Sequence, residues 1–299
     1  MPDTKIALLP DRGIVSVTGE DAEKLLQGVI TNDMELLGSQ QAIHAGLLTP
    51  QGKILFAFFV VKAPEGFLLE TDRDHTSALT ERIHRYKLRA KAEIEDASSD
   101  YSVAAIWGGP YDPHGRGKQP LWFADPRHPE MGYREYVTID SDWALAGDQA
   151  DSATADEYHA HRIALGVPQA GLDYELGNAY PHEALFDQLA GVSFKKGCFV
   201  GQEVVARTQN RKMARKRIVP VVAETALPES GAPIVIGGVE IGKLGSTADK
   251  RGLALIRLDR VPELTAKGGE LMAGSVPIRI DIPKWATFSL EQFTADSSA

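Results

Sequence analysis

The first hundred residues alternate between strand-like and helix-like patterns of hydrophobic and polar positions. Apolar residues at every second position indicate strands, and apolar residues three or four positions apart indicate helices. Strands are expected over 5–17 with a turn at 10–13, over 44–61 as a hairpin, over 67–70 and over 88–94; helices are expected over 22–29 and 77–86. The hairpin turns where Pro50 is followed two residues later by Gly52, a combination that favours reverse turns. This mixture predicts an α+β layer.

Two helices of the chain are expected to begin at capping boxes, in which two side chains satisfy free backbone N–H groups. Thr18 and Asp21 have the required spacing before the helix at 22–29. Thr154 and Glu157 have it before a helix that should stop at Gly166, because glycine favours the end of a helix.

The last third of the chain has a different pattern. After Arg217, short β-like runs are separated by glycine, proline and aspartate, which is typical of a small β-barrel. We therefore place a domain boundary near 212. The Gly- and Pro-rich stretch at 108–120 is interpreted as a loop.

Residues 195–203 are the stretch on which the functional interpretation depends. They contain Cys198, the single cysteine among 299 residues, with Gly197 before it and Gly201 three positions after it. A helix beginning at Gly201 would direct free N–H groups and its positive dipole at the thiol. Together with Lys196, this would favour the reactive thiolate. The other interpretation is a tight turn with a buried cysteine, because unpaired cysteine is often buried.

Composition and charge narrow the class of protein. Hydrophobic residues make up 43% and charged residues 24%, the proportions of a soluble globular protein. The net charge of −9 argues against broad, non-specific binding to nucleic acid or anionic membranes. One cysteine excludes an intrachain disulfide and a Cys-rich metal site. The start lacks a signal-peptide pattern, and the apolar run 54–61 is too short to span a bilayer, so we expect a cytoplasmic protein without membrane contact.

Two motifs resemble functional sites but favour plainer structures. Residues 237–243 nearly match a phosphate-binding loop, yet Leu244 stands where a serine or threonine should hold magnesium, so a hairpin turn is expected. His159 and His161 are two positions apart and would point to different faces of a helix. We therefore expect no metal site.

Two further features leave alternatives open. The stretch 207–217 contains six basic residues and is either a solvated connector or a dock for a polyglutamate tail, an RNA phosphate or an acidic partner. Glu183 is either a surface carboxylate or, beside a cavity, an acceptor for two N–H groups of an aminopyrimidine-type ring.

The motif at 196–203, with Val205, Ala206 and Arg207, resembles the signature of the YgfZ family. These folate-binding proteins are related to the aminomethyltransferase, or T-protein, of the glycine cleavage system. Other segments resemble the family in the same order, and together they cover nearly the whole chain. They are 26–33, 48–53, 86–91, 125–127, 191–194 and 252–257.

This resemblance implies a T-protein-like ring of three domains: two α+β domains and a C-terminal β-barrel around a central hole that holds tetrahydrofolate. The first domain would combine 1–45 with 146–212, the second would span 46–145, and the barrel 213–299. Cys198 and Lys196 match the family's functional pair, and Glu183 best matches the glutamate that contacts the pterin. Further folate-binding residues are expected at Asn32, Gly201, Gln202 and Arg207.

The related aminomethyltransferases carry an aspartate on the strand after the position of Gly52. Here 53–59 has no carboxylate, and a positioned acid or base is typically worth ~10²–10⁴ in rate. The resemblance therefore implies a tetrahydrofolate-binding accessory protein for iron–sulfur proteins, including tRNA-modifying enzymes, with an aminomethyl or one-carbon transferase as the alternative. Expected partners are folate, including its polyglutamylated forms, iron–sulfur proteins or assembly factors and, through 207–217, tRNA. We expect a monomer.

Overall fold

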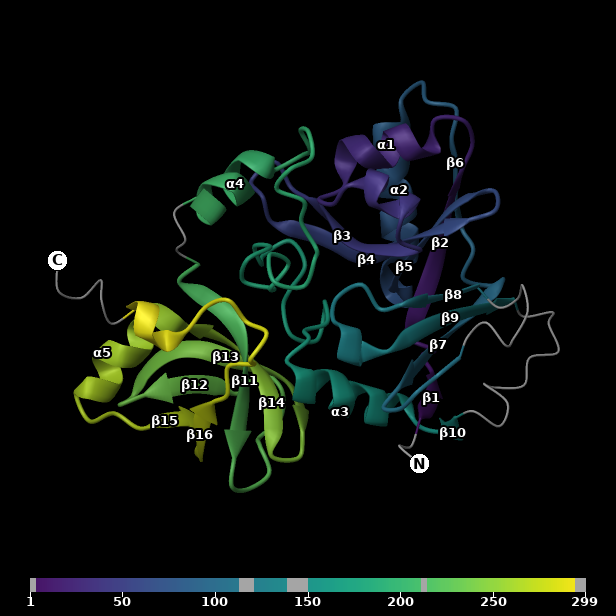
Figure 1. Ribbon diagram of the computed structural model, residues 1–299. Coiled ribbons are helices and arrows are strands. Elements are labelled where there is room, and N and C mark those ends of the chain that lie inside the picture. The colour runs from purple at the N-terminus through teal and green to yellow at the C-terminus, as the bar shows by residue number, and fades with distance from the viewer. Residues whose placement is uncertain (1–3, 113–120, 139–149, 211–213, 294–299) are drawn as a thin grey trace. The chain divides into compact units, whose positions relative to one another are not determined.

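The computed structural model describes residues 4–112, 121–138, 150–210 and 214–293, and its chain divides into two compact units (Figure 1). The first unit contains Met1–Tyr158 and Leu189–Gln202, and the second contains His159–Gln188 and Glu203–Ala299. The chain therefore enters the second unit before it completes the first. Of the loop expected at 108–120, residues 113–120 lie outside the described ranges.

The first unit contains an antiparallel five-stranded sheet of order β3-β4-β5-β2-β6. Its strands are β2 (Arg12–Thr18), β3 (Ala42–Leu48), β4 (Ile54–Ala63), β5 (Gly66–Asp72) and β6 (Glu93–Asp96). Helices α1 (Ala22–Val29) and α2 (Thr76–Lys87) pack against it and bury Leu26, Leu79 and Ile83 in its core. The predicted hairpin and both predicted helices are confirmed.

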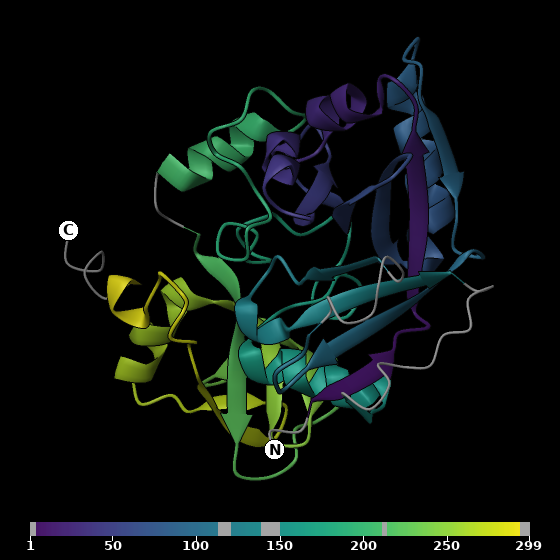
Figure 2. The ribbon, with the colours of Figure 1, turned by 45° about the vertical axis from the view of Figure 1, so that its right-hand side comes forward.

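A second five-stranded sheet in the first unit has the order β10-β1-β7-β9-β8. Its strands are β1 (Lys5–Leu8), β7 (Tyr101–Trp107), β8 (Leu121–Ala124), β9 (Tyr133–Thr138) and β10 (Asp151–Ser152). The strand region expected at 5–17 is thus two strands that lie in different sheets, and Figure 2 shows these two purple strands diverging. A turn closed by the Arg12 N–H and the Leu9 carbonyl (3.1 Å) separates them.

The strand predicted over 88–94 is wrong for most of its length. Helix α2 continues to Lys87, and Ala90 N–H then donates to the Lys87 carbonyl (2.7 Å), so Leu88 and Arg89 form a reverse turn. Strand β6 begins only at Glu93. The alternation failed because the apolar positions of the turn do not face a core.

The second unit contains a closed barrel of order β11-β14-β13-β12-β15-β16. Its strands are β11 (Lys216–Ala223), β12 (Pro233–Ile236), β13 (Val239–Ala248), β14 (Arg251–Arg257), β15 (Leu271–Ala273) and β16 (Val276–Ile280), with helix α5 (Val261–Ala266) against β12. Pairing of β11 with β16 closes it. Gly237 and Gly238, both at positive φ, form the turn between β12 and β13, which confirms the hairpin expected in place of a phosphate loop.

One capping box is confirmed and the other is not. At helix α3 (Ala155–Leu165), Thr154 N–H donates to the Glu157 carboxylate (3.0 Å), and Glu157 N–H donates to the Thr154 hydroxyl (3.2 Å). Gly166 follows at φ +79°, as expected for a helix end. Helix α1 has Asp21 at its cap with no side-chain hydrogen bond to the helix, because the Asp21 carboxylate accepts from Lys91 N–H instead.

The α+β fold class with a C-terminal β-barrel is confirmed by these two sheets, their helices and the closed barrel. The three-domain division into 1–45 with 146–212, 46–145 and 213–299 stays a prediction.

Candidate functional site

The segment at 189–202, called the cysteine segment below, is tied to the loop after α1 and to β3, far earlier in the chain. Thr31 donates its hydroxyl to the Gly191 carbonyl (2.6 Å), and Ser193 N–H donates to the Thr31 carbonyl (3.0 Å). His44 Nδ1 lies 3.0 Å from the Leu189 carbonyl. Because a carbonyl only accepts, Nδ1 carries the proton of the neutral imidazole.

Asn32 is the most fully engaged of the predicted folate-binding residues. Its amide nitrogen donates to the carbonyls of His44 and Ala190 (2.7 Å each), and its oxygen accepts from Asp33 N–H (2.9 Å). Ala190 has φ +51°, a conformation that costs free energy outside glycine. Asn32 therefore holds this strained residue in place, and both hydrogens of its amide are used within the protein.

Lys196 points into the first unit. Its ammonium group donates to the carbonyls of Gln27 (2.7 Å), Ile30 (2.8 Å) and Asn32 (2.8 Å), and the residue is 8% exposed. An ammonium has three hydrogens, so each one has a carbonyl acceptor. The Gln27 and Ile30 carbonyls lie at the C-terminal end of α1, where a cation is favourable. Burial lowers the pKa of Lys196 to about 8, and Asp33 opposes that shift.

Cys198, two residues farther on, is exposed. The turn that presents it ends at Gly201, which has φ +81°, and a Cβ atom there would lie 2.6 Å from the Thr49 carbonyl. Only glycine fits this approach, because it lacks the Cβ and tolerates positive φ. Helix α4 (Gln202–Asn210) begins at the next residue, one position after the expected start. The interpretation of Cys198 as a buried side chain is wrong.

A pocket of ≈ 290 Å³ opens beside the cysteine segment, within the first unit. The segment contributes one wall with Ala190, Val192, Ser193, Phe194 and Lys195, and the rest comes from Asn32, Leu36, Gln40, Ile43, His44 and Pro126. Phe194 is 42% exposed, so part of its ring is accessible. A volume near ~300 Å³ is at the lower end of the range for small-molecule sites.

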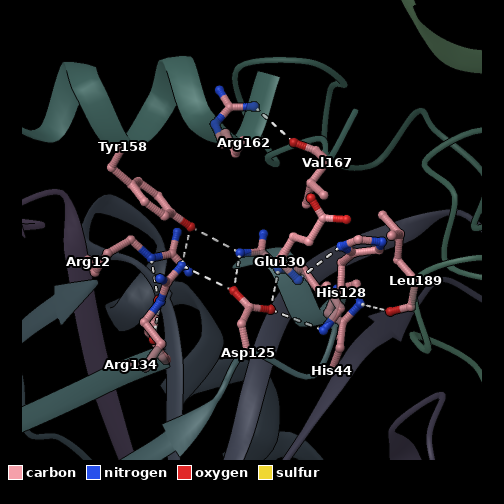
Figure 3. Close-up of polar contacts among 12 residues, drawn as sticks. Arg12, His44, Asp125, His128, Glu130, Arg134, Tyr158, Arg162, Val167 and Leu189 are labelled. Atoms are coloured by element: carbon pink, nitrogen blue, oxygen red, sulfur yellow. Dashed lines mark hydrogen bonds and ion pairs between the residues drawn. The ribbon is translucent and has the colours of Figure 1, made fainter. Parts of the chain in front are cut away.

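A buried ionic network includes Asp125 and Arg134 (Figure 3) and begins next to Pro126, which lines the pocket. Arg127 makes a two-pronged ion pair with Asp125 through Nε (3.0 Å) and Nη2 (2.6 Å). The Arg127 charge lowers the pKa of the Asp125 carboxyl to about 2, against the opposing effect of burial. Because Pro126 lies between these two residues and lines the pocket, the ion pair fixes that wall.

Burial also determines the protonation state of His44, which lines the same pocket. It lowers the pKa of His44 to about 4, an effect partly offset by the bond to the Leu189 carbonyl. His44 is therefore neutral at pH 7.

The network continues through Arg134, which bonds to the Tyr158 hydroxyl and lies 3.6 Å from the Glu70 carboxylate. Glu70 is fully buried and accepts from Arg12 Nε (2.9 Å) and from the Tyr136 hydroxyl (3.0 Å). This network was not predicted from the sequence. Charged residues inside strands, such as Glu70 and Arg134, were the available signal. Their pairing could not be predicted, because the partners of Glu70 lie 58 to 66 positions away.

The remaining predicted site residues lie at the start of α4 and in the second unit. Gln202 is the first residue of α4, and Arg207 makes an exposed ion pair with Glu203 one turn earlier (2.9 Å). The Glu183 carboxylate accepts from Tyr180 N–H within its own turn (3.0 Å). Glu183 and Cys198 belong to different units.

The basic run at 207–217 is not uniform. Arg217 is buried and makes a two-pronged ion pair with Asp187 (2.9 and 2.8 Å). Arg211 and Lys212 lie outside the described residues. Arg217 therefore belongs to the packing of the second unit.

Neither a metal cluster nor a membrane helix is present in the part of the chain that the structure describes. No group of three or more histidine, cysteine, aspartate or glutamate side chains there could hold a metal ion. His159 is bonded to Arg162 Nε (3.1 Å). No described helix has the length and apolar character needed to cross a membrane.

The chain is similar to a known protein family and to curated relatives. Residues 215–288 match the family described as CAF17, C-terminal beta-barrel domain. A Mycosarcoma maydis protein, the mitochondrial iron–sulfur cluster assembly factor IBA57 homolog, is 37% identical over 237 residues, which are 73% of this chain and 57% of the relative. The mitochondrial iron–sulfur cluster assembly factor IBA57 of Mus musculus is 32% identical over 282 residues, 85% of this chain and 77% of the relative.

Among solved structures, the glycine cleavage system aminomethyltransferase T from Bartonella henselae matches with a TM-score of 0.74 and 14% identity, over 95% of this chain and 87% of that chain. At that identity the likeness shows the fold alone. This chain spans little more than half the length of the fungal relative. Both relatives are mitochondrial by name, which contradicts the cytoplasmic location expected from the sequence.

Proposed function

Because the chain belongs to the IBA57 family of iron–sulfur cluster assembly factors, we propose that it supports the assembly or repair of iron–sulfur proteins and binds tetrahydrofolate in doing so. Within this family we assign it to the YgfZ type, on the motif at 196–203. The enzymes served include those that modify tRNA. The clusters themselves are cargo, because a single cysteine cannot hold one without ligands from a partner.

The observation that carries the proposal is the geometry of the cysteine segment. One short stretch lines a pocket with residues 190–195, anchors itself through Lys196 and exposes Cys198 two residues later. An exposed thiol on an anchored loop suits a step in which the thiol meets a partner protein. In this arrangement Lys196 positions the thiol rather than touching the reacting atoms.

The pocket supports folate binding in the first unit. Its volume of ≈ 290 Å³ suits one ring system, and the accessible face of Phe194 offers a stacking surface. Asn32 would act by holding the pocket wall, since its amide hydrogens are already donated. Independently of this pocket, the family resemblance makes Glu183 our proposed partner of the pterin, with Gly201, Gln202 and Arg207 as further folate-binding residues.

The alternative of an aminomethyltransferase has less support. Strand β4 has no carboxylate over 54–59. The nearby buried carboxylates are occupied, Glu70 by Arg12 and Tyr136, and Asp125 by Arg127. Arg127 holds the pKa of the buried Asp125 carboxyl low, so this carboxylate is a poor proton acceptor at neutral pH. We propose that the protein does not catalyse aminomethyl transfer.

The thiol is tested in cells that lack the native protein. Cys198→Ser and Cys198→Ala are expected to lose most of the activity of an iron–sulfur enzyme while protein levels stay at the wild-type value. A Lys250→Ala variant, changed at an exposed residue of the barrel, serves as the control and should keep full activity. Full activity of both Cys198 variants would remove the thiol from the mechanism.

Folate binding is tested by calorimetric titration with tetrahydrofolate. Glu183→Gln is expected to weaken binding about tenfold or more, because a carboxylate that accepts two N–H bonds is lost. Glu229→Gln, at an exposed position of the same unit, is the matched control. Equal affinities of the wild type and Glu183→Gln would refute the pterin assignment, and no heat with any protein would refute folate binding.

If the basic run at 207–217 binds RNA, the affinity for RNA should fall steeply as the salt concentration rises.

A further inference from the structure

Leu88 is the most exposed large hydrophobic residue in the described part of the chain. It is 88% exposed, whereas Leu8, Leu36, Leu172, Phe194 and Val239 are 37–47% exposed. Single exposed hydrophobic residues are common and need no explanation by themselves. Leu88 differs because its backbone is also unfavourable.

The backbone of Leu88 has φ +46° and ψ −103°. These angles are close to the first central position of a type II′ turn, at about +60° and −120°, where glycine is strongly preferred. Ala90 N–H donates to the Lys87 carbonyl (2.7 Å), which closes this turn. A leucine with positive φ is an outlier and costs free energy that glycine would not. Since the side chain is not packed against the protein, folding alone favours glycine here.

The turn is held firmly on both sides. Helix α2 precedes it, and His84 Nε2 lies 3.0 Å from the Ile94 carbonyl. After the turn, Lys91 N–H donates to the Asp21 carboxylate (2.8 Å), and Asp21 N–H donates to the Lys91 carbonyl (3.1 Å). Leu88 is thus presented in a fixed position, which reduces the ordering cost of a contact with another molecule.

Basic residues surround the turn, although the whole chain has a net charge of −9. They are Arg85, Lys87, Arg89 and Lys91. Arg85 and Lys91 are in exposed ion pairs with Glu81 (3.9 Å) and Glu20 (2.9 Å), which are weak in water. Within the described residues, Lys87 and Arg89 form no ion pair. The positive charges on both sides of Leu88 are therefore not compensated by an acidic side chain.

We propose that the turn Lys87–Ala90 is a docking site for an acidic partner protein, which receives Leu88 in an apolar pocket rimmed by carboxylates. An aliphatic side chain has no ring to stack on a base, so the apolar tip favours protein over RNA. One leucine is also too little apolar surface to hold a protein on a membrane. The flanking charges add orientation and speed of encounter. The proposal depends on neither folate nor Cys198.

The contact is tested by placing the photo-reactive residue p-benzoylphenylalanine at position 88 of the full-length protein in living cells. The same residue at position 172, a leucine exposed in the second unit, is the control. We expect a discrete protein adduct at 88 that is absent at 172. Its yield should fall at least tenfold when Arg89→Glu or Lys87→Glu is added, because the charge complementarity is reversed. An adduct that survives charge reversal, an adduct with RNA, or no adduct above the control overturns the proposal.

The cross-linked partner is then purified, and its affinity for the protein is measured without the photo-reactive residue. Leu88→Gly is expected to weaken binding at least tenfold while its midpoint of thermal unfolding stays equal to or above that of the wild type. Leu172→Gly should leave the affinity unchanged. Unchanged affinity of Leu88→Gly, or a partner without an acidic surface, would contradict the proposal.

Discussion

The cysteine segment and the turn at Lys87–Ala90 both depart from the usual burial of residues, in opposite directions. In the segment the charged Lys196 lies inside and the small Cys198 lies outside; in the turn the apolar Leu88 lies outside between two cations. The first departure is balanced within the protein, because three carbonyls accept the ammonium hydrogens. The second has no such balance in the described residues. The difference teaches that an inward charge can be explained by folding, whereas a strained outward leucine requires another molecule.

The largest expected effect is a loss of stability when the buried Lys196 is replaced. Lys196→Met removes the donor to three carbonyls, and an unsatisfied buried carbonyl costs about 1–3 kcal/mol. With partial access of water, we expect the free energy of unfolding to fall by about 3 kcal/mol, measured by urea denaturation. Lys195→Met, at the exposed neighbouring lysine, should change it by less than about 0.5 kcal/mol. Equal stability of the two variants would mean that Lys196 is not an anchor.

Acid should weaken the contacts of His44 with the cysteine segment. The pKa of His44 in the folded protein is about 4, below 6.5 in the unfolded chain, so the unfolded chain binds more protons below pH 6.5. The contribution of neutral His44 is complete above pH 6.5 and is lost as the pH falls toward 4, by about 3 kcal/mol in total. Unfolding measured between pH 7 and 4.5 should depend less on pH in His44→Asn than in the wild type. Identical pH profiles would contradict this.

Replacing the exposed Leu88 should have a smaller effect on the free energy of unfolding, with the opposite sign. Leu88→Gly relieves a positive φ at a residue that packs against nothing, and should raise the free energy of unfolding by about 1 kcal/mol or leave it unchanged. Leu88→Ala keeps the strain and should not raise it. Thermal and urea unfolding of the three proteins distinguish these outcomes. A clear loss of stability in Leu88→Gly would show that leucine serves the fold.

The smallest effect on stability is expected at Cys198. The thiol is exposed, so Cys198→Ser should change the free energy of unfolding by less than about 0.5 kcal/mol. The same variant is expected to lose support of iron–sulfur enzymes in cells. A large loss of stability would turn the functional result into a folding defect and would contradict the contrast between Lys196 and Cys198.

Local patterns predicted most elements because those elements depend on near neighbours. The box of Thr154 and Glu157 spans four positions, and the turn at Gly237 and Gly238 is set by their freedom at positive φ. The direction of Lys196 could not be predicted, because its acceptors lie 164–169 positions earlier. The motif pointed to Lys196 and Cys198 as a pair, but periodicity contains no information on which of them faces inward.

The same limit explains the turn at Leu88. Alternation over 88–94 is a valid strand signal only if one side meets a core. Here Leu88 and Arg89 form a turn before strand β6 begins at Glu93. Family resemblance supplied the fold class and the iron–sulfur context, which are properties of the whole chain. The wrong cellular location came instead from the lack of a signal-peptide pattern, which was interpreted without relatives.

The late position of the cysteine segment has a consequence for biosynthesis. A ribosome makes β1 to β10 and the first part of the second unit before residues 189–202 emerge. Until then the carbonyls of Gln27, Ile30 and Asn32 have no ammonium donor, and the Thr31 hydroxyl has no Gly191 acceptor. Domains generally fold as units during synthesis, so the first unit is completed by the stretch that carries the thiol. A nascent chain therefore places Cys198 in its native, exposed position only when it completes the first unit.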